Sequence, residues 1–132
     1  MHVSLPPDVF LHVCQVHDRV RELWHASGRE RASLHDATWG REVIYDAFGE
    51  LILLDLAVAG VVSSKKNRSM KPERLALVLK YLRMEGRPGG EFCRWMADHR
   101  ETYPLLCQQF MLLNYCRFVL LTALEPFAAL AA

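Results

Sequence analysis

The sequence predicts an all-α protein, a single-domain bundle of about five helices with two central apolar helices. Hydrophobic residues make up 52% of the 132-residue chain and charged residues 23%, a balance typical of globular domains. Hydrophobic side chains recur at helical spacing in several long segments. The alternating patterns and Asn-Gly turns that mark strands are absent. At this length we expect one helical domain that spans residues 1–132.

The first helix is expected to begin after the segment LPPD and to end near His25. Val13, Val16 and Val20 fall on one side of such a helix, and polar residues fall on the other. The Ser-Gly pair at 27–28 then ends the helix, because glycine is common just past a helix end. The next segment, RERASLHDA, is polar and short, and we expect it to form a loop or a single turn.

Two long segments are apolar nearly all round, which is typical of helices at the centre of a bundle. The second predicted helix covers about residues 39–62, and the fifth covers about residues 105–124. Gly49 and Gly60 lower the helix propensity of the second helix, and we expect them to let a neighbouring backbone come close. The last residues, LEPFAALAA, are expected to form only a trailing end.

Prolines and glycines set the limits of the third and fourth helices. Pro72 suits the first turn of the third helix, which we expect to run to about residue 85 and to stop at the segment GRPGG. The fourth helix is expected over about residues 91–102, and Pro104 ends or kinks it.

Two charged residues fall on apolar sides of the predicted central helices. At about 100° per residue, Asp55 lands among Ile44, Phe48 and Leu51, opposite the other acids of its helix. Arg117 lies among apolar residues of the fifth helix. Because an unpaired buried charge is costly, we expect Asp55 and Arg117 to form a buried ion pair, within the subunit or across a dimer interface. A role in helix packing is favoured over a catalytic carboxylate.

The net charge of +1 hides a basic middle region, because residues 65–100 hold ten Lys and Arg against four Asp and Glu. Lys and Arg beside Ser and Asn donors suit contact with phosphates or with an acidic partner. The segment SSKKNRSMKPER has no interleaved aromatic residues that would stack on single-stranded bases. A solvated connection between two apolar helices is the competing interpretation. The candidate contact residues are Lys65, Lys66, Arg68, Lys71, Arg74, Lys80, Arg83 and Arg87.

The segment RWMADH, from Arg94 to His99, resembles the Arg-x4–6-His signature of the HEPN ribonucleases. Those are small all-helical proteins that often act as dimers, and the resemblance implies metal-free RNA cleavage by Arg94 and His99 at a dimer cleft. The segment RERASLH has a matching spacing. Positions five apart on one helix point roughly 140° from each other, so a histidine at the core edge and a solvated arginine are the favoured interpretation.

No metal or cofactor site is predicted. Cys14, Cys93, Cys107 and Cys116 form no CxxC or His/Cys ligand spacing, and the six histidines lack the His-x3-His pattern of a helical metal site. The first residues lack the features of a signal peptide, which predicts reduced cysteines and a cytoplasmic location. The chain has no run of 18 charge-free apolar residues, so we expect no membrane span.

Surplus apolar surface underlies the preferred functional prediction. Leu77 and Met84 fall on the outward side of the third helix, and two helices that are apolar all round exceed what one small bundle easily covers. We therefore expect a small non-enzymatic interaction or regulatory protein, a homodimer that binds another protein through apolar helix surface. The alternative explanation of this apolar character is that the two helices simply form the centre of the bundle. A nucleic-acid-associated subunit that uses residues 65–100 is the alternative function, and a HEPN-like ribonuclease is a further one. No small-molecule substrate is inferred.

Overall fold

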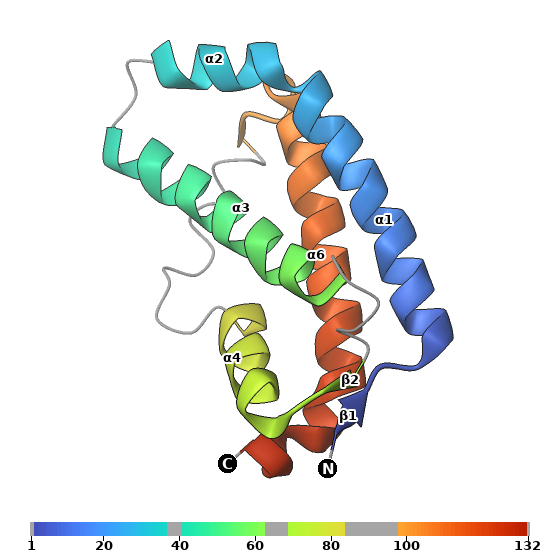
Figure 1. Ribbon diagram of the computed structural model, residues 1–132. Helices are drawn as coiled ribbons and strands as arrows, with labels where there is room; N and C mark the ends of the chain where they lie inside the picture. Colours follow the sequence, from blue (N-terminus) through green and yellow to red (C-terminus); the bar gives the residue numbers. More distant parts are fainter. Residues whose placement is uncertain (1, 37–40, 63–68, 84–97, 132) are drawn as a thin grey trace.

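The computed structural model describes residues 2–36, 41–62, 69–83 and 98–131, with the backbone alone at 35, 36, 41–48 and 50 (Figure 1). The part described is an all-α bundle, which confirms the predicted fold class. Its elements are β1 (Val3–Ser4), α1 (Pro7–Ala26), α2 (Gly28–Asp36), α3 (Arg41–Val62), β2 (Ser69–Met70), α4 (Pro72–Leu82), α6 (Pro104–Leu124) and the 3-10 helix η2 (Glu125–Ala131).

Four of the predicted helices match the described ones closely. The first and fifth predicted helices correspond to α1 and α6, the second to α3, and Pro72 lies in the first turn of α4, as predicted. The fourth predicted helix, over about residues 91–102, falls largely outside the described residues, and 99–102 form a turn. The loop or single turn predicted for residues 29–37 is wrong, because α2 is helical from Gly28 to Asp36.

Helix α6 lies at the centre of the bundle, antiparallel to α1, with α3 crossing it and α4 beside its C-terminal half (Figure 1). Both long helices turn apolar side chains toward this centre. The buried residues of α1 are Phe10, Val13, His17, Val20 and Leu23. Those of α6 are Leu106, Cys107, Gln109, Phe110, Leu113, Cys116, Leu120 and Leu124.

The polar helix α2 is stabilised at its start by contacts with its neighbours. The Arg31 guanidinium lies 3.9 Å from the centre of the Trp24 ring, a cation–π contact, and it also donates to the Trp24 carbonyl and to Ser27 Oγ. The Glu30 carboxylate accepts the backbone N–H groups of Leu105 at 3.0 Å and Leu106 at 3.3 Å. Glu30 therefore caps the start of α6, where the N-cap residue supplies no side-chain hydrogen bond.

Two short additions close the opposite end of the bundle. Strands β1 and β2 pair antiparallel, with Val3 opposite Met70, and both of these side chains are buried. The predicted trailing end is instead the 3-10 helix η2, and Glu125 at its start accepts two hydrogen bonds of 2.6 Å from Arg83 after α4. The Arg83 hydrogen bonds lower the pKa of the Glu125 carboxyl.

The two glycines of α3 were expected to let a neighbouring backbone come close. A Cβ built at Gly49 or Gly60 meets no atom of the described residues within 4 Å, so within the described part of the chain no backbone makes the close approach that was predicted at these positions. Their conformational freedom costs helix stability, and no contact at the missing side chain offsets this cost within the described part of the chain.

Among the described residues, Pro104–Ala131 is long and apolar enough to cross a membrane by length and composition, with a mean hydropathy of 1.3. No such segment was expected from the sequence, because Arg117 and Glu125 interrupt the apolar run. The core helix of a bundle meets the same criterion, and eight residues of α6 are buried inside this one.

Candidate protein-docking surface

Exposed apolar side chains gather on α3 and α4. Each is between 39% and 60% exposed, which is high for leucine and isoleucine in a small bundle. The members are Ile52, Leu53, Leu56, Leu77 and Tyr81, and we call them the docking surface. On α4, Leu75, Leu79 and Leu82 occupy the buried side of the helix, so Leu77 and Tyr81 point outward.

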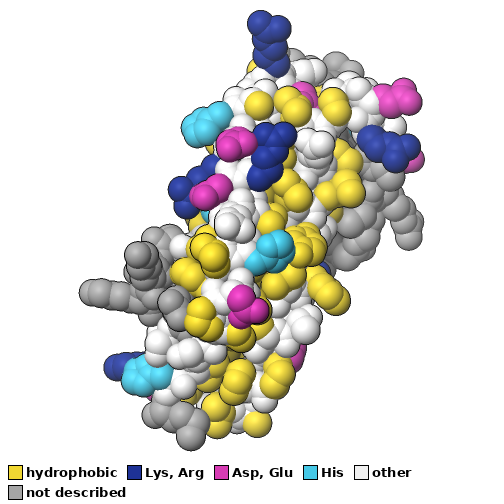
Figure 2. Space-filling view, turned by 90° about the vertical axis from the view of Figure 1, so that its right-hand side faces the viewer, with side chains coloured by type: hydrophobic (Ala, Val, Ile, Leu, Met, Phe, Trp, Pro, Cys, Tyr) yellow, Lys and Arg dark blue, Asp and Glu magenta, His cyan; other side chains and the backbone are white. Residues whose placement is uncertain are grey.

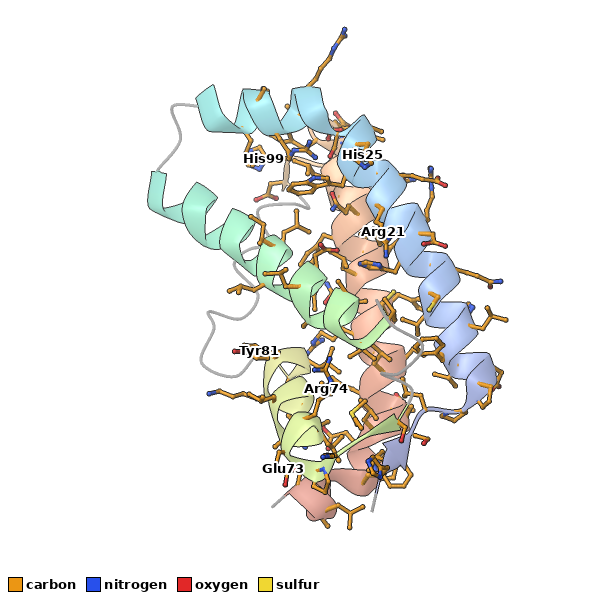
Figure 3. The ribbon with its side chains drawn as sticks, viewed as in Figure 1. Arg21, His25, Glu73, Arg74, Tyr81 and His99 are labelled. Carbon is orange, nitrogen blue, oxygen red and sulfur yellow. The ribbon has the colours of Figure 1, made fainter. Side chains whose placement is uncertain are left out.

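Two hollows lie on either side of Leu56. The α1–α3 hollow has a volume of about 320 Å³ and is lined by Val20, Arg21, Trp24, His25, Ile52, Asp55 and Leu56. The α3–α4 hollow has a volume of about 220 Å³ and is lined by Leu56, Ala57, Gly60, Arg74, Leu77, Val78 and Tyr81. Figure 3 shows Arg21 and His25 on α1 at one end of this region, and Arg74 and Tyr81 on α4 at the other.

Charged and apolar side chains are mixed at the edge of this region. Figure 2, which views the α1 side of the bundle, shows apolar side chains along its length with Lys, Arg, Asp and Glu between them. The Arg74 guanidinium donates to the Gly60 carbonyl at 2.7 Å, which holds this arginine at the rim of the α3–α4 hollow. Arg21 is exposed at the rim of the α1–α3 hollow.

The ion pair predicted between Asp55 and Arg117 is not formed within the subunit. Nε2 of His17 donates to Asp55 Oδ1 at 3.0 Å, and Arg117 Nε donates to the Leu82 carbonyl at 2.5 Å. The two helices cross so that Asp55 faces α1, whereas Arg117 faces the end of α4. Pairing across a dimer interface stays a prediction.

Neither of these two charges is as buried as the helical pattern suggested. The Asp55 side chain is 39% exposed and borders the α1–α3 hollow, while the His17 that contacts it is only 2% exposed. Nδ1 of His17 is buried, and it has no hydrogen-bond partner among the described residues. The contact of His17 with Asp55 fixes α1 against α3.

The predicted basic contact residues on α4 do not share one face. Arg74 and Arg83 point about 180° apart on the helix, since nine residues separate them. Arg74 turns to α3 and Arg83 to η2, while Lys71 and Lys80 are exposed. Lys65, Lys66, Arg68 and Arg87 lie outside the described residues, so contact with nucleic acid or an acidic partner stays a prediction.

The other predicted positions are only partly described. Leu77 is exposed and lines the α3–α4 hollow, and its contact with a partner protein stays a prediction; Met84 lies outside the described residues. Arg94 also lies outside them. His99 belongs to the turn before α6, where its carbonyl accepts the backbone N–H groups of Thr102 and Tyr103.

The thiols of the described cysteines stay protonated because they are partly or fully buried. Burial raises the pKa of Cys14, Cys107 and Cys116, and that of Cys116 reaches about 12. A thiol in this state is a poor nucleophile and a poor metal ligand at neutral pH. In the described part of the chain, no three His, Cys, Asp or Glu side chains are grouped so that they could hold a metal ion.

Comparisons with known proteins give no relative: no family model, no curated protein and no solved structure matches this chain.

Sequence reasoning placed Leu77 on the outward side of its helix, where it is exposed, but it predicted none of the other exposed residues of the docking surface. Ile52, Leu53 and Leu56 belong to the segment that was predicted to be central because it is apolar all round. The sequence did not predict that Arg21 and His25 of α1 line the α1–α3 hollow (Figure 3). Their place there depends on the angle at which α3 crosses α1.

Proposed function

We propose that this chain is a small non-enzymatic interaction protein with a regulatory role, a homodimer whose docking surface binds a helical segment of another protein. The observation that carries the proposal is the placement of Leu56. It is exposed between two hollows, each lined mainly by apolar side chains and with an arginine at its rim, and Asp55 also borders the α1–α3 hollow. Contiguous exposed apolar patches rimmed by polar residues are typical of sites where proteins bind other proteins, membranes or ligands.

The energetic argument rests on the docking surface itself. Burying an exposed leucine or tyrosine side chain stabilises a complex by roughly 1.5–3 kcal/mol, before the costs of association are subtracted. Each of the five side chains is only partly exposed, so each supplies only part of that free energy of burial. The total suits a regulatory complex of moderate affinity.

The shape of the surface favours a helix as the bound element. An amphipathic helix presents large apolar side chains at positions i, i+3, i+4 and i+7, which is how such helices fill adjacent hollows. Hollows of about 320 and 220 Å³ accept one large apolar side chain each, with Leu56 between them. Arg21 and Arg74 favour carboxylates on the flanks of that helix.

A selection experiment tests the proposal. A displayed library of helical peptides is selected on the purified chain, and we expect enriched sequences with large apolar residues at helical spacing and flanking Asp or Glu. Leu56→Asp and Leu77→Asp should each weaken the best peptide at least tenfold, since each places a charge in an apolar contact. Leu11→Asp, at an exposed position of α1 that lines neither hollow, is the matched control. Enriched peptides that bind both variants as well as the wild type would overturn the proposal, and so would a selection without enrichment.

A further inference from the structure

A second apolar surface lies on the outer side of α6. Met111, Tyr115 and Phe118 follow one another at helical spacing and are 64%, 44% and 68% exposed. Gln108 and Thr122 extend the row at its two ends and are also exposed. We call these five residues the outer stripe. No charged residue belongs to it, and it faces away from the buried side of the helix.

The middle of the outer stripe is held in place. Nε2 of His12 and the Tyr115 hydroxyl are joined by a hydrogen bond of 2.5 Å, and their rings meet edge to face at 5.5 Å. The Tyr115 ring therefore has a fixed orientation before any partner arrives, which lowers the entropy cost of using it in a contact.

The residues of the outer stripe are spaced almost evenly on the two sides of Tyr115. Gln108 and Thr122 lie seven residues to either side of it, while Met111 lies four before and Phe118 three after. When two such helices pack antiparallel around Tyr115, Met111 of each meets Phe118 of the other, and the polar ends face each other. A surface that matches itself under a two-fold axis is what an isologous dimer needs.

The charges of α1 that flank the outer stripe fit the same arrangement. Helix α1 runs antiparallel to α6 (Figure 1), and His12 contacts Tyr115. Equal steps along the two helices from this contact bring Arg19 level with Gln108 and Asp8 level with Val119. Both side chains are exposed, and Arg19 pairs with Glu22 at 2.9 Å. Two-fold pairing brings Arg19 of each copy toward Asp8 of the other, so opposite charges meet at both ends.

We infer that the outer stripe is the contact between two copies of this chain, with the α6 helices antiparallel and the two-fold axis at Tyr115. The inference deepens the proposed function, because it rests on the homodimer and locates its interface. The docking surfaces, on α3 and α4, stay open in such a dimer.

Cysteine cross-linking tests the register. Tyr115→Cys is expected to give a covalent dimer with a short bis-maleimide, since the two introduced thiols meet at the axis. Gln108→Cys alone should give none, because its two copies lie about 20 Å apart along the helices. A mixture of the Gln108→Cys and Thr122→Cys chains should cross-link. The wild-type chain is the blank for its native thiols, of which Cys14, Cys107 and Cys116 are protected.

Three results would overturn the inference. The first is that Tyr115→Cys gives no more dimer than the blank, and the second is that Gln108→Cys cross-links to itself as efficiently as Tyr115→Cys. The third is flotation of the wild-type chain with phosphatidylcholine vesicles in place of dimerisation, which would assign the outer stripe to a lipid surface. Peptide binding that still depends on Leu77 would show that the docking proposal survives such a failure.

Discussion

Helices α3 and α6 are alike in sequence and different in their surroundings. They have 22 and 21 residues, and both were expected at the centre of the bundle because both are largely apolar. Helix α6 is central and leaves a charge-free row outside, the outer stripe. Helix α3 also exposes apolar side chains, Ile52, Leu53 and Leu56, but these lie beside hollows with arginines at their rims. An apolar helix is therefore not always a core helix, since part of its surface can face solvent.

The contacts at the ends of α6 explain part of this difference. Glu30 on α2 caps the first turn of α6. In the second half of α6, Arg117 donates a hydrogen bond to the Leu82 carbonyl in the last turn of α4. The described half of α3 is tied to α1 by Asp55 and His17 and to α4 by Arg74. These contacts lie on the sides of the helix, and they leave the outward side of the described half of α3 uncovered.

The largest expected effect separates the two sides of α3. Leu54 is fully buried and its neighbour Leu53 is 42% exposed. Leu54→Ala should lower the free energy of unfolding by about 2–5 kcal/mol, because it removes buried contacts and leaves a cavity. Leu53→Ala, the same change one position away, should cost less than about 1 kcal/mol. Urea denaturation measures both, and equal losses would show that α3 has no open side.

The next effect concerns the anchoring of α6. Glu30→Ala should lower the free energy of unfolding by about 1–2 kcal/mol, since it leaves the first N–H groups of α6 without their carboxylate. Arg29→Ala, at an exposed position of the same helix, is the control and should change little. Thermal denaturation compares the two, and a Glu30→Ala chain as stable as this control would contradict the capping role.

A pH dependence should arise inside α6. Burial raises the pKa of the Cys116 thiol from 9.0 to about 12, so the folded chain keeps a proton that the unfolded chain loses. This contribution to stability is complete below pH 9 and falls as the pH rises toward 12, with a slope of at most about 1.4 kcal/mol per pH unit. Urea denaturation at a series of pH values should show a shallower slope in Cys116→Ala. An unchanged slope in that variant would contradict the assignment.

The smallest effect returns to α3. Gly60→Ala should raise the free energy of unfolding by about 0.5–1 kcal/mol, because the added Cβ meets open space and the helix loses a flexible residue. Urea denaturation of this variant beside the wild type measures the gain. A loss of stability would mean that some neighbour does approach Gly60.

The sequence was sufficient for elements whose pattern is local. The helical spacing of Val13, Val16 and Val20 predicted α1, and Pro72 marked the start of α4. Helix α2 was missed because its residues are polar and only Leu34 among its described side chains is buried; contacts from Arg31 to Trp24 and from Glu30 to α6 stabilise it. Those contacts join segments far apart in the chain, which no local pattern reports.

The candidate site was predictable only at Leu77, for the same reason. The helical pattern placed Asp55 on the buried side of its helix, whereas its side chain is 39% exposed, and its partner on the facing helix depends on the crossing angle. His17 on α1 occupies that place, and Arg117 reaches α4. The short pairing of Val3 with Met70 likewise joins two segments that carry no strand pattern of their own.

The most direct test is the mass in solution of three chains, measured by sedimentation equilibrium. The wild type and Leu77→Asp should have twice the mass of one chain, whereas Phe118→Asp should have the mass of a single chain with its helical circular dichroism unchanged. A single-chain mass for the wild type would contradict this account of two apolar surfaces with two roles, and so would a dimer that Leu77→Asp breaks and Phe118→Asp does not.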